Sequence, residues 1–170
     1  MLVQLLAIMP LARSRAAAFL APLNAAMVEF GITTPARQAS FLSQVGHESG
    51  QLLYVRELAS GQAYEGRADL GNTQRGDGVR FRGRGLLQVT GRTNYAACGK
   101  ALGLDLLAQP DLIEQTVNAC RSAGWFWQTR GLNALADAGD QERVTRRING
   151  GVNGLAERLA LYQAARKVLV

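Results

Sequence analysis

The sequence has one histidine and two cysteines among 170 residues, and this scarcity argues against several kinds of site. Cys98 and Cys120 form neither a CxxC motif nor the spacing of zinc ligands, so we expect no metal site. His47 and Glu48 begin a pattern that could bind zinc, but Gln51 stands where an HExxH motif needs its second histidine. We expect the cysteines to be buried thiols in a reducing compartment, although a disulfide stays open.

Long apolar runs and low-complexity tracts are also missing. No apolar run approaches the roughly 20 residues that a membrane-spanning helix needs. Residues 1–9 are apolar, but Arg13 and Arg15 follow this stretch instead of preceding it, unlike the basic start of a signal peptide. With 48% hydrophobic residues and no linker, residues 1–170 are predicted to form a single domain. If this domain acts outside the cytoplasm, another component must let it out.

Positive charge predominates among the ionisable residues. The net charge is +6 and the isoelectric point is near 10. Such a protein is attracted to polyanions, whether nucleic acid, an anionic membrane or a cell wall, and the charge alone does not choose among them. Gly83-Arg84-Gly85 lacks the spacing of a phosphate-binding loop, so the glycines do not indicate a nucleotide site.

Apolar residues recur with helical spacing over most of the chain. They predict helices over residues 13–30, 33–50, 95–102, 110–129, 140–148 and 154–169. Thr34, Asp140 and Asn153 are candidate N-caps. Residues 51–85 are rich in Gly, Arg and Asp and predict a long irregular segment, which in a compact domain is usually functional. Alternation over 79–82 and a β-prone run over 86–90 predict a small hairpin, so the expected class is mainly α with a minor β element.

The stretch from Phe41 to Gly50 carries the strongest chemical signal. Phe41, Val45 and Glu48 are spaced by four and three residues, so a helix places them on one face. Glu48 then lies on the core side of the last turn, where burial and the negative end of the helix dipole both disfavour an anion. A carboxyl group held protonated near neutral pH is suited to act as a general acid. The alternative is a glutamate at the edge of the face that extends to water.

The irregular segment offers acidic partners for Glu48: Glu57, Glu65, Asp69 and Asp77. Glycoside hydrolysis uses two carboxyl groups flanking the bond, about 6.5–9.5 Å apart when water attacks directly. An acid at a helix end that faces a second acid on a loop suits this wider separation. Taken singly, each loop acid is more commonly a solvated surface charge.

Arg158 lies on or beside the apolar stripe of the last predicted helix, three residues after Leu155 and four before Tyr162. At the edge of the stripe its side chain can extend to water. If it is buried, it needs a carboxylate partner, and a catalytic glutamate would serve.

Several motifs in order resemble the family 19 glycoside hydrolases, in particular their phage endolysin branch. The resemblance covers nearly the whole chain. It is carried by five segments: Gly46–Gly50, Tyr54–Glu57, Tyr64–Asn72, Phe81–Tyr95 and Ile148–Gly151.

The resemblance implies a lysozyme-like, two-lobed helical fold with the substrate cleft between the lobes, and an inverting mechanism without a metal or organic cofactor. Glu48 matches the general acid. Glu57 matches the general base, with Glu65 as its rival, and Thr90 matches a hydroxyl that helps hold the attacking water. Further matched positions contact the sugar or order the cleft: Gln88, Asn94, Tyr95, Asn149 and Arg158.

Departures from the chitinase pattern, such as Leu86 in place of proline and Thr90 in place of serine, favour peptidoglycan over chitin. We therefore expect a monomeric endolysin that cleaves β-1,4 bonds of peptidoglycan. It would be stored in the host cytoplasm, released through a lesion made by a holin, and active in the periplasm. A chitinase, a lytic transglycosylase and, more remotely, a basic nucleic-acid-binding protein are the alternatives. No nucleic-acid recognition helix stands out.

Overall fold

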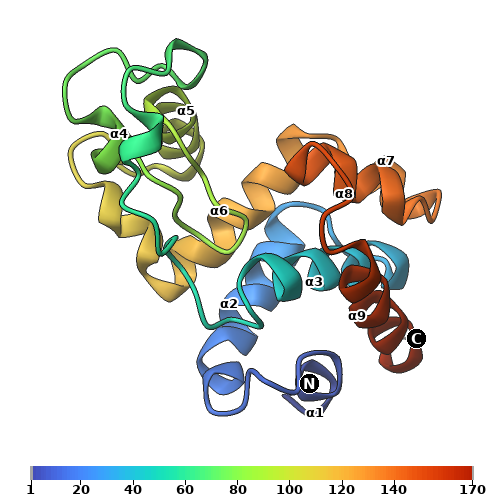
Figure 1. The fold of residues 1–170 in the computed structure, drawn as a ribbon. Coiled ribbons are helices and arrows are strands. Elements are labelled where there is room, and N and C mark those ends of the chain that lie inside the picture. Colours follow the sequence, from blue (N-terminus) through green and yellow to red (C-terminus); the bar gives the residue numbers. More distant parts are fainter. Residues whose placement is uncertain (1, 170) are drawn as a thin grey trace.

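The computed structural model describes residues 2–169, and its regular structure is helical (Figure 1). The mainly α class is therefore confirmed. The two lobes seen in Figure 1 confirm the two-lobed arrangement as well. The α-helices are α1 (Leu2–Ile8), α2 (Arg15–Glu29), α3 (Pro35–Glu48), α4 (Asp77–Arg80), α5 (Arg92–Leu102), α6 (Thr116–Thr129), α7 (Leu132–Asp137), α8 (Gln141–Asn149) and α9 (Leu155–Val168). Short 3₁₀ turns are η1 (Gln62–Tyr64), η2 (Ala68–Leu70) and η3 (Pro110–Glu114).

Local chemistry explains where several helices begin. The Thr34 hydroxyl accepts a hydrogen bond from the Arg37 amide at the start of α3, and Pro35 occupies the first helical position. Asp140 caps α8 in the same way. The prediction that Asn153 caps the last helix is wrong, because Gly154 takes that place with a φ of +70°. A side chain at Gly154 would also collide with the His47 ring.

Two lobes are built around α3 and α6 (Figure 1). The larger lobe holds α1, α2, α3, α7, α8 and α9, in which α3 packs against both α9 and α7. Phe41 of α3 meets Trp127 edge to face at 5.4 Å, and both rings are fully buried. The smaller lobe holds residues 51–114, including α4 and α5. Helix α6 packs on α2 in the larger lobe and on α5 and η3 in the smaller one.

The predicted strand over residues 79–82 is wrong. Val79 and Arg80 belong to α4, which begins after Gly76 at a φ of +90°. The remaining extended pairing consists of two isolated antiparallel bridges, Arg56 with Arg84 and Arg84 with Val89. A short run of alternating residues is compatible with one helical turn as well as with a strand. Here Gly76 adopts a positive φ, and the helical turn of α4 begins directly after it.

The helix predicted over residues 110–129 is divided. Gln115 has extended backbone angles and separates η3 from α6. The Asn118 side-chain amide donates to the Leu112 carbonyl at 2.9 Å, so a polar side chain stabilises the break. Val117, an apolar residue near the start of α6, is 54% exposed.

The buried face of α9 differs from the apolar stripe of Leu155 and Tyr162 that the sequence indicated. Its buried residues are Arg158, Leu161 and Ala165. Leu159, the apolar residue next to Arg158, is 37% exposed. Arg158 therefore lies at the centre of the buried face, which excludes a side chain extended to water.

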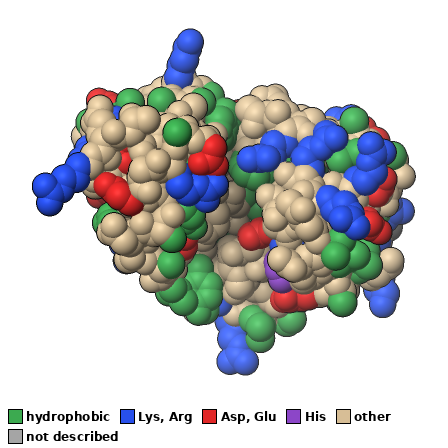
Figure 2. Space-filling view, turned by 45° about the horizontal axis from the view of Figure 1, so that its top comes forward, with side chains coloured by type: hydrophobic (Ala, Val, Ile, Leu, Met, Phe, Trp, Pro, Cys, Tyr) green, Lys and Arg blue, Asp and Glu red, His purple; other side chains and the backbone are tan. Residues whose placement is uncertain are grey.

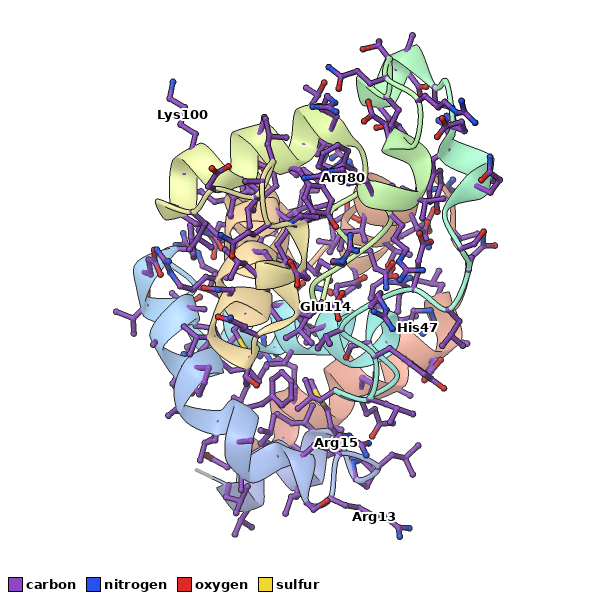
Figure 3. All side chains as sticks on the ribbon, turned by 90° about the vertical axis from the view of Figure 1, so that its left-hand side faces the viewer. Arg13, Arg15, His47, Arg80, Lys100 and Glu114 are labelled. Carbon is purple, nitrogen blue, oxygen red and sulfur yellow. The ribbon has the colours of Figure 1, made fainter. Side chains whose placement is uncertain are left out.

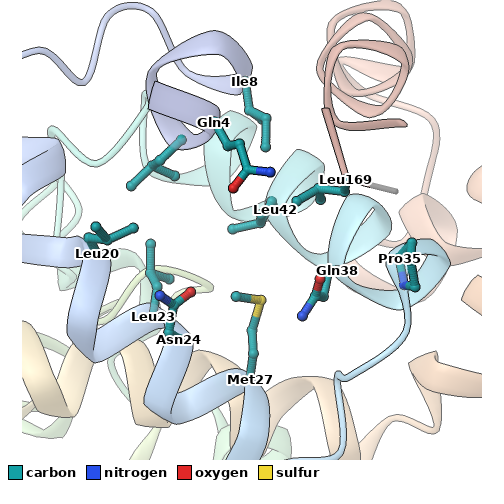
Figure 4. A pocket seen from close by; sticks show the side chains of 11 residues that line it. Gln4, Ile8, Leu20, Leu23, Asn24, Met27, Pro35, Gln38, Leu42 and Leu169 are labelled. Atoms are coloured by element: carbon teal, nitrogen blue, oxygen red, sulfur yellow. The ribbon is translucent and has the colours of Figure 1, made fainter. Parts of the chain in front are cut away.

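Within residues 2–169, no helix is both long enough and apolar enough to cross a bilayer. Basic side chains lie at opposite ends of the molecule, with Arg13 at one end and Lys100 at the other (Figure 3). A pocket of about 270 Å³ lies between α1, α2 and α3, away from the lobe boundary, and is lined by apolar side chains, Leu169 among them, together with the amides of Gln4, Asn24 and Gln38 (Figure 4).

Candidate active site

A groove of about 550 Å³ lies between the lobes. The larger lobe contributes Glu48 at the end of α3 and Asn149 at the end of α8. The smaller lobe contributes residues from Leu87 to Ala97, and the last turn of α6 completes the wall. Figure 2 shows the hollow between the two masses of the molecule. The groove that contains Glu48 therefore lies where the cleft was predicted, between the two lobes.

Glu48 is held by Arg158. The Arg158 Nη2 donates to Glu48 Oε1 at 2.6 Å, its Nη1 donates to Gln44 Oε1, and its Nε donates to the Asn153 carbonyl at 3.2 Å. The Arg158 side chain is 2% exposed and the Glu48 side chain is 22% exposed. Hydrogen bonds and an opposite charge therefore offset the cost of burying this guanidinium. The expectation of a buried arginine paired with Glu48 matches this geometry.

The partner changes the electrostatics expected at Glu48. Burial at a helix end disfavours the carboxylate, as the sequence indicated, but the adjacent Arg158 cation favours it. His47, the preceding residue, turns the other way and its Nδ1 contacts Glu157 Oε2 at 2.7 Å. Two consecutive residues of α3 are thus each paired with a residue of α9.

The facing wall is formed by the segment that contains Gln88, Thr90 and Asn94, all of which line the groove. The Asn94 amide donates to the Thr90 carbonyl at 2.7 Å and fixes the turn into α5. Gln88 has a φ of +42°. Gly83 lies directly behind this wall, because a Cβ there would overlap Gln88 and approach Thr90 Oγ1 to 3.3 Å.

Glu57 lies beside this wall but does not line the groove. Its Oε1 accepts from the Gly83 amide at 2.8 Å, and its Oε2 accepts from the Tyr64 hydroxyl at 2.9 Å. Burial and this bond to Glu57 raise the pKa of Tyr64. Glu57 faces a neighbouring depression that it shares with Arg82 and other residues. Gly83 therefore links the two: its amide binds the Glu57 carboxylate, and its Cα lies against Gln88 and Thr90 of the groove wall.

Glu65, the alternative candidate for the general base, binds backbone amides at the start of α4. Its two carboxylate oxygens accept from the Gly76 and Gly78 amides at 2.6 and 2.8 Å. It does not line the groove either. These bonds hold the start of α4, so Glu65 is placed to stabilise the irregular segment, and Glu57 is the better candidate of the two.

Two other predicted positions support the site in different ways. Tyr95 is fully buried, and its hydroxyl donates to the Arg82 carbonyl at 2.6 Å and accepts from Arg84 at 3.0 Å. It therefore orders the smaller lobe instead of facing the groove. Asn149 lines the groove and donates to the Asn153 carbonyl at 3.1 Å, the same oxygen that accepts from Arg158.

The groove also includes residues that the sequence analysis did not identify as part of the site. Trp125, Phe126, Thr129 and Arg130 of α6 and its cap all line it. The Arg130 guanidinium lies 4.2 Å from the centre of the Phe126 ring. Their spacing of four residues signals a shared face, but it does not tell whether that face meets protein or solvent.

No group of three or more His, Cys, Asp or Glu side chains in the described part of the chain could hold a metal ion. Cys98 and Cys120 are free and buried, and burial raises the pKa of each thiol to about 12. The expectation of two buried thiols is confirmed, and neither lines the groove.

Comparison with known proteins adds to this geometry. The family model for chitinase class I, glycoside hydrolase family 19, matches residues 24–139. A glycosyl hydrolase family 19 domain-containing protein of Haemophilus influenzae is 33% identical over 174 residues, which cover 84% of each chain. An endochitinase of Arabidopsis thaliana is 36% identical over 135 residues, but these cover 79% of this chain and 46% of the plant protein.

Solved structures of family 19 chitinases have a similar fold. A bacterial family 19 chitinase has a TM-score of 0.79 at 26% identity and covers 98% of this chain and 93% of its own. Chitinase C from Streptomyces griseus has a TM-score of 0.76 at 26% identity, with 98% and 75% covered. Family match, relatives and fold point to the same enzyme class. The chain therefore belongs to glycoside hydrolase family 19 and is a glycoside hydrolase.

Proposed function

We propose that this glycoside hydrolase cleaves β-1,4 bonds of peptidoglycan with inversion, using Glu48 as its general acid. The observation that carries the proposal is the Glu48–Arg158 pair on one wall of a groove whose other wall presents Thr90, Gln88 and Asn94. Glycosidic cleavage needs a carboxyl group that can protonate the leaving oxygen, and Glu48 is placed in the groove to do so.

In the proposed reaction, Glu48 gives its proton to the glycosidic oxygen as the bond from that oxygen to the anomeric carbon breaks. A water held with Thr90 attacks the opposite face of the sugar and loses a proton to Glu57, whose side chain must first turn from the neighbouring depression toward the groove. Each Glu57 oxygen accepts one hydrogen bond, from Gly83 or from Tyr64, and keeps a second lone pair that can take the proton.

Arg158 has a positioning role in this proposal. It fixes the Glu48 carboxylate while water has access to the groove, and Asn149 shares its Asn153 anchor. A bound glycan excludes that water, which favours the neutral form of a carboxyl group.

Chitin is the second candidate substrate, because several relatives are described as endochitinases. The chain spans less than half the length of those plant proteins. Glycol chitin and purified peptidoglycan assayed in parallel separate the two substrates. Mass spectra of the products separate hydrolysis from transglycosylation, because hydrolysis leaves reducing ends and a lytic transglycosylase leaves 1,6-anhydro sugars.

The proposed setting is host-cell lysis by a phage. The enzyme would act as a monomer, wait in the host cytoplasm and reach peptidoglycan through a holin lesion. Its net charge of +6 supports adsorption to anionic envelope components. A nucleic-acid-binding role predicts instead a duplex affinity that falls steeply with salt and does not depend on Glu48.

The decisive experiment compares wild type with Glu48→Gln, Glu57→Gln and Glu65→Gln on peptidoglycan, with folding checked by circular dichroism. Removing a general acid or base typically costs about 10²–10⁴-fold in rate, so the first two variants should be nearly inactive. Glu65→Gln should keep its turnover once folded. Full activity in a folded Glu48→Gln protein would refute the proposed mechanism.

A further inference from the structure

Arg130 is a groove residue whose charge the proposed reaction does not use. It follows the last residue of α6 and lines the same groove as Glu48. Its guanidinium stacks on the Phe126 ring at 4.2 Å, and its Nη1 donates to the Arg147 carbonyl at 3.3 Å. Arg147 returns a bond from its own Nη1 to the Arg130 carbonyl at 3.1 Å. Two guanidinium side chains are thus tied to each other's backbone beside the groove.

No carboxylate neutralises Arg130 within residues 2–169. Arg37, Arg92 and Arg121 each donate to an aspartate or glutamate, and those hydrogen bonds raise their pKa values. Burial instead lowers the pKa of Arg130, and no anion acts against it. Arg130 remains exposed to water, so within residues 2–169 the structure presents an accessible cation at the groove and supplies no counter-charge for it.

The orientation of Arg130 leaves one edge of its guanidinium free. Stacking on Phe126 fixes the plane, and Nη1 is occupied by the Arg147 carbonyl. Nε and Nη2 donate to none of the residues that the structure describes. These two atoms form the edge that binds a carboxylate through two parallel hydrogen bonds.

We propose that Arg130 binds a carboxylate group of the glycan substrate and so selects acidic strands over neutral ones. This proposal rests on the proposed function, since it names the substrate class of the same groove. Peptidoglycan carries carboxylates on its stem peptides, and its lactyl ethers carry a free carboxylate where the peptide has been removed, whereas chitin carries none. Figure 2 shows Lys and Arg side chains on the right-hand mass beside the hollow, a setting that favours an anionic ligand.

The test compares wild type, Arg130→Gln, Arg130→Lys and Arg166→Gln on three substrates. These are intact peptidoglycan, glycan strands stripped of their peptides, and glycol chitin. Arg166 is an exposed residue of α9 outside the groove, so its variant controls for the loss of one positive charge. Thermal melts followed by circular dichroism confirm that each variant is folded.

We expect Arg130→Gln to lower kcat/KM on intact peptidoglycan about tenfold, the size of a charge-assisted hydrogen bond at a partly exposed site. Arg130→Lys should recover part of this loss, while Arg166→Gln and all rates on glycol chitin should stay near wild type. A tenfold effect that disappears on stripped strands assigns the carboxylate to the stem peptide, and one that persists shows that Arg130 also binds the lactyl carboxylate that stripping frees.

Equal losses on glycol chitin and peptidoglycan, or no loss on peptidoglycan, would overturn the role of Arg130. A failure of the proposed function looks different: the wild type itself would then leave peptidoglycan intact, or a folded Glu48→Gln variant would still cleave it.

Discussion

Replacing Arg158 with methionine tests the central ion pair most directly. Methionine keeps much of the side-chain length and removes every polar contact that Arg158 makes. The change leaves the Glu48 carboxylate without its cation and the Gln44 side-chain oxygen without its donor, while the Asn153 carbonyl keeps only its bond from Asn149. The buried end of α3 would then contain an uncompensated anion.

The cost can be estimated from burial. Breaking a fully buried ion pair by removing one partner costs about 3–5 kcal/mol, because the remaining charge stays desolvated. The Glu48 side chain is 22% exposed, so water recovers part of this energy, and we expect about 2–3 kcal/mol. For a domain of this size, the melting temperature should fall by about 5–10 °C.

Urea unfolding of four proteins measures the coupling: wild type, Arg158→Met, Glu48→Gln and the double variant. A neutral glutamine does not need the cation, so the double variant should recover at least about 1 kcal/mol of the Arg158→Met loss. Arg166→Met on the exposed face of α9 is the control and should change stability by less than about 0.5 kcal/mol. Strict additivity, or an Arg158→Met protein as stable as the control, would refute the reasoning.

Three further predictions concern pH, packing and salt. The hydrogen bonds from Arg92 lower the pKa of Asp77, so this pair should stabilise the fold above the unfolded aspartate value of about 3.9 and lose that contribution as pH falls further. Asp77→Asn should therefore lower the melting temperature at pH 7 and flatten its dependence on acid pH; an unchanged acid limb would contradict this. Gly124→Ala would force a methyl group into the Phe30 ring and should cost about 1–3 kcal/mol in urea unfolding, whereas wild-type stability would show that the ring moves freely. Clearing of cell-wall suspensions should slow as salt rises, because screening weakens adsorption, and a salt-independent rate would exclude that role for the net charge.

Periodicity predicted most of the helical body and placed Arg158 on or beside a buried stripe. The pairing of Arg158 with Glu48 followed only if Arg158 was buried, and periodicity left that choice open. Helical spacing fixes which side chains share a face, so Phe41, Val45 and Glu48 fall on one side of α3. The exact buried face of α9 was less certain, since its leucines occur all round the helix and packing against α3 selects among them. That packing placed Arg158 at the centre and left Leu159 partly outside.

The groove itself could be predicted only in part. Trp125 and Phe126 have the composition of core residues, and periodicity does not separate a face that meets protein from one that lines a cleft. Arg130 at the helix end carried no motif at all. Among the loop acids, the choice between Glu57 and Glu65 depends on which backbone amides each carboxylate meets, a feature of tertiary structure.

Helix α6 has a mechanical consequence for the enzyme. The same rod packs on α2 in one lobe and on α5 and η3 in the other, so both walls of the groove are anchored to one continuous element. Bending a regular helix breaks its hydrogen-bond ladder, which makes a hinge within α6 costly. The span between Glu48 and the Thr90 wall is accordingly set when the chain folds. The sugar ring, as the softer partner, must supply the distortion needed to reach the transition state.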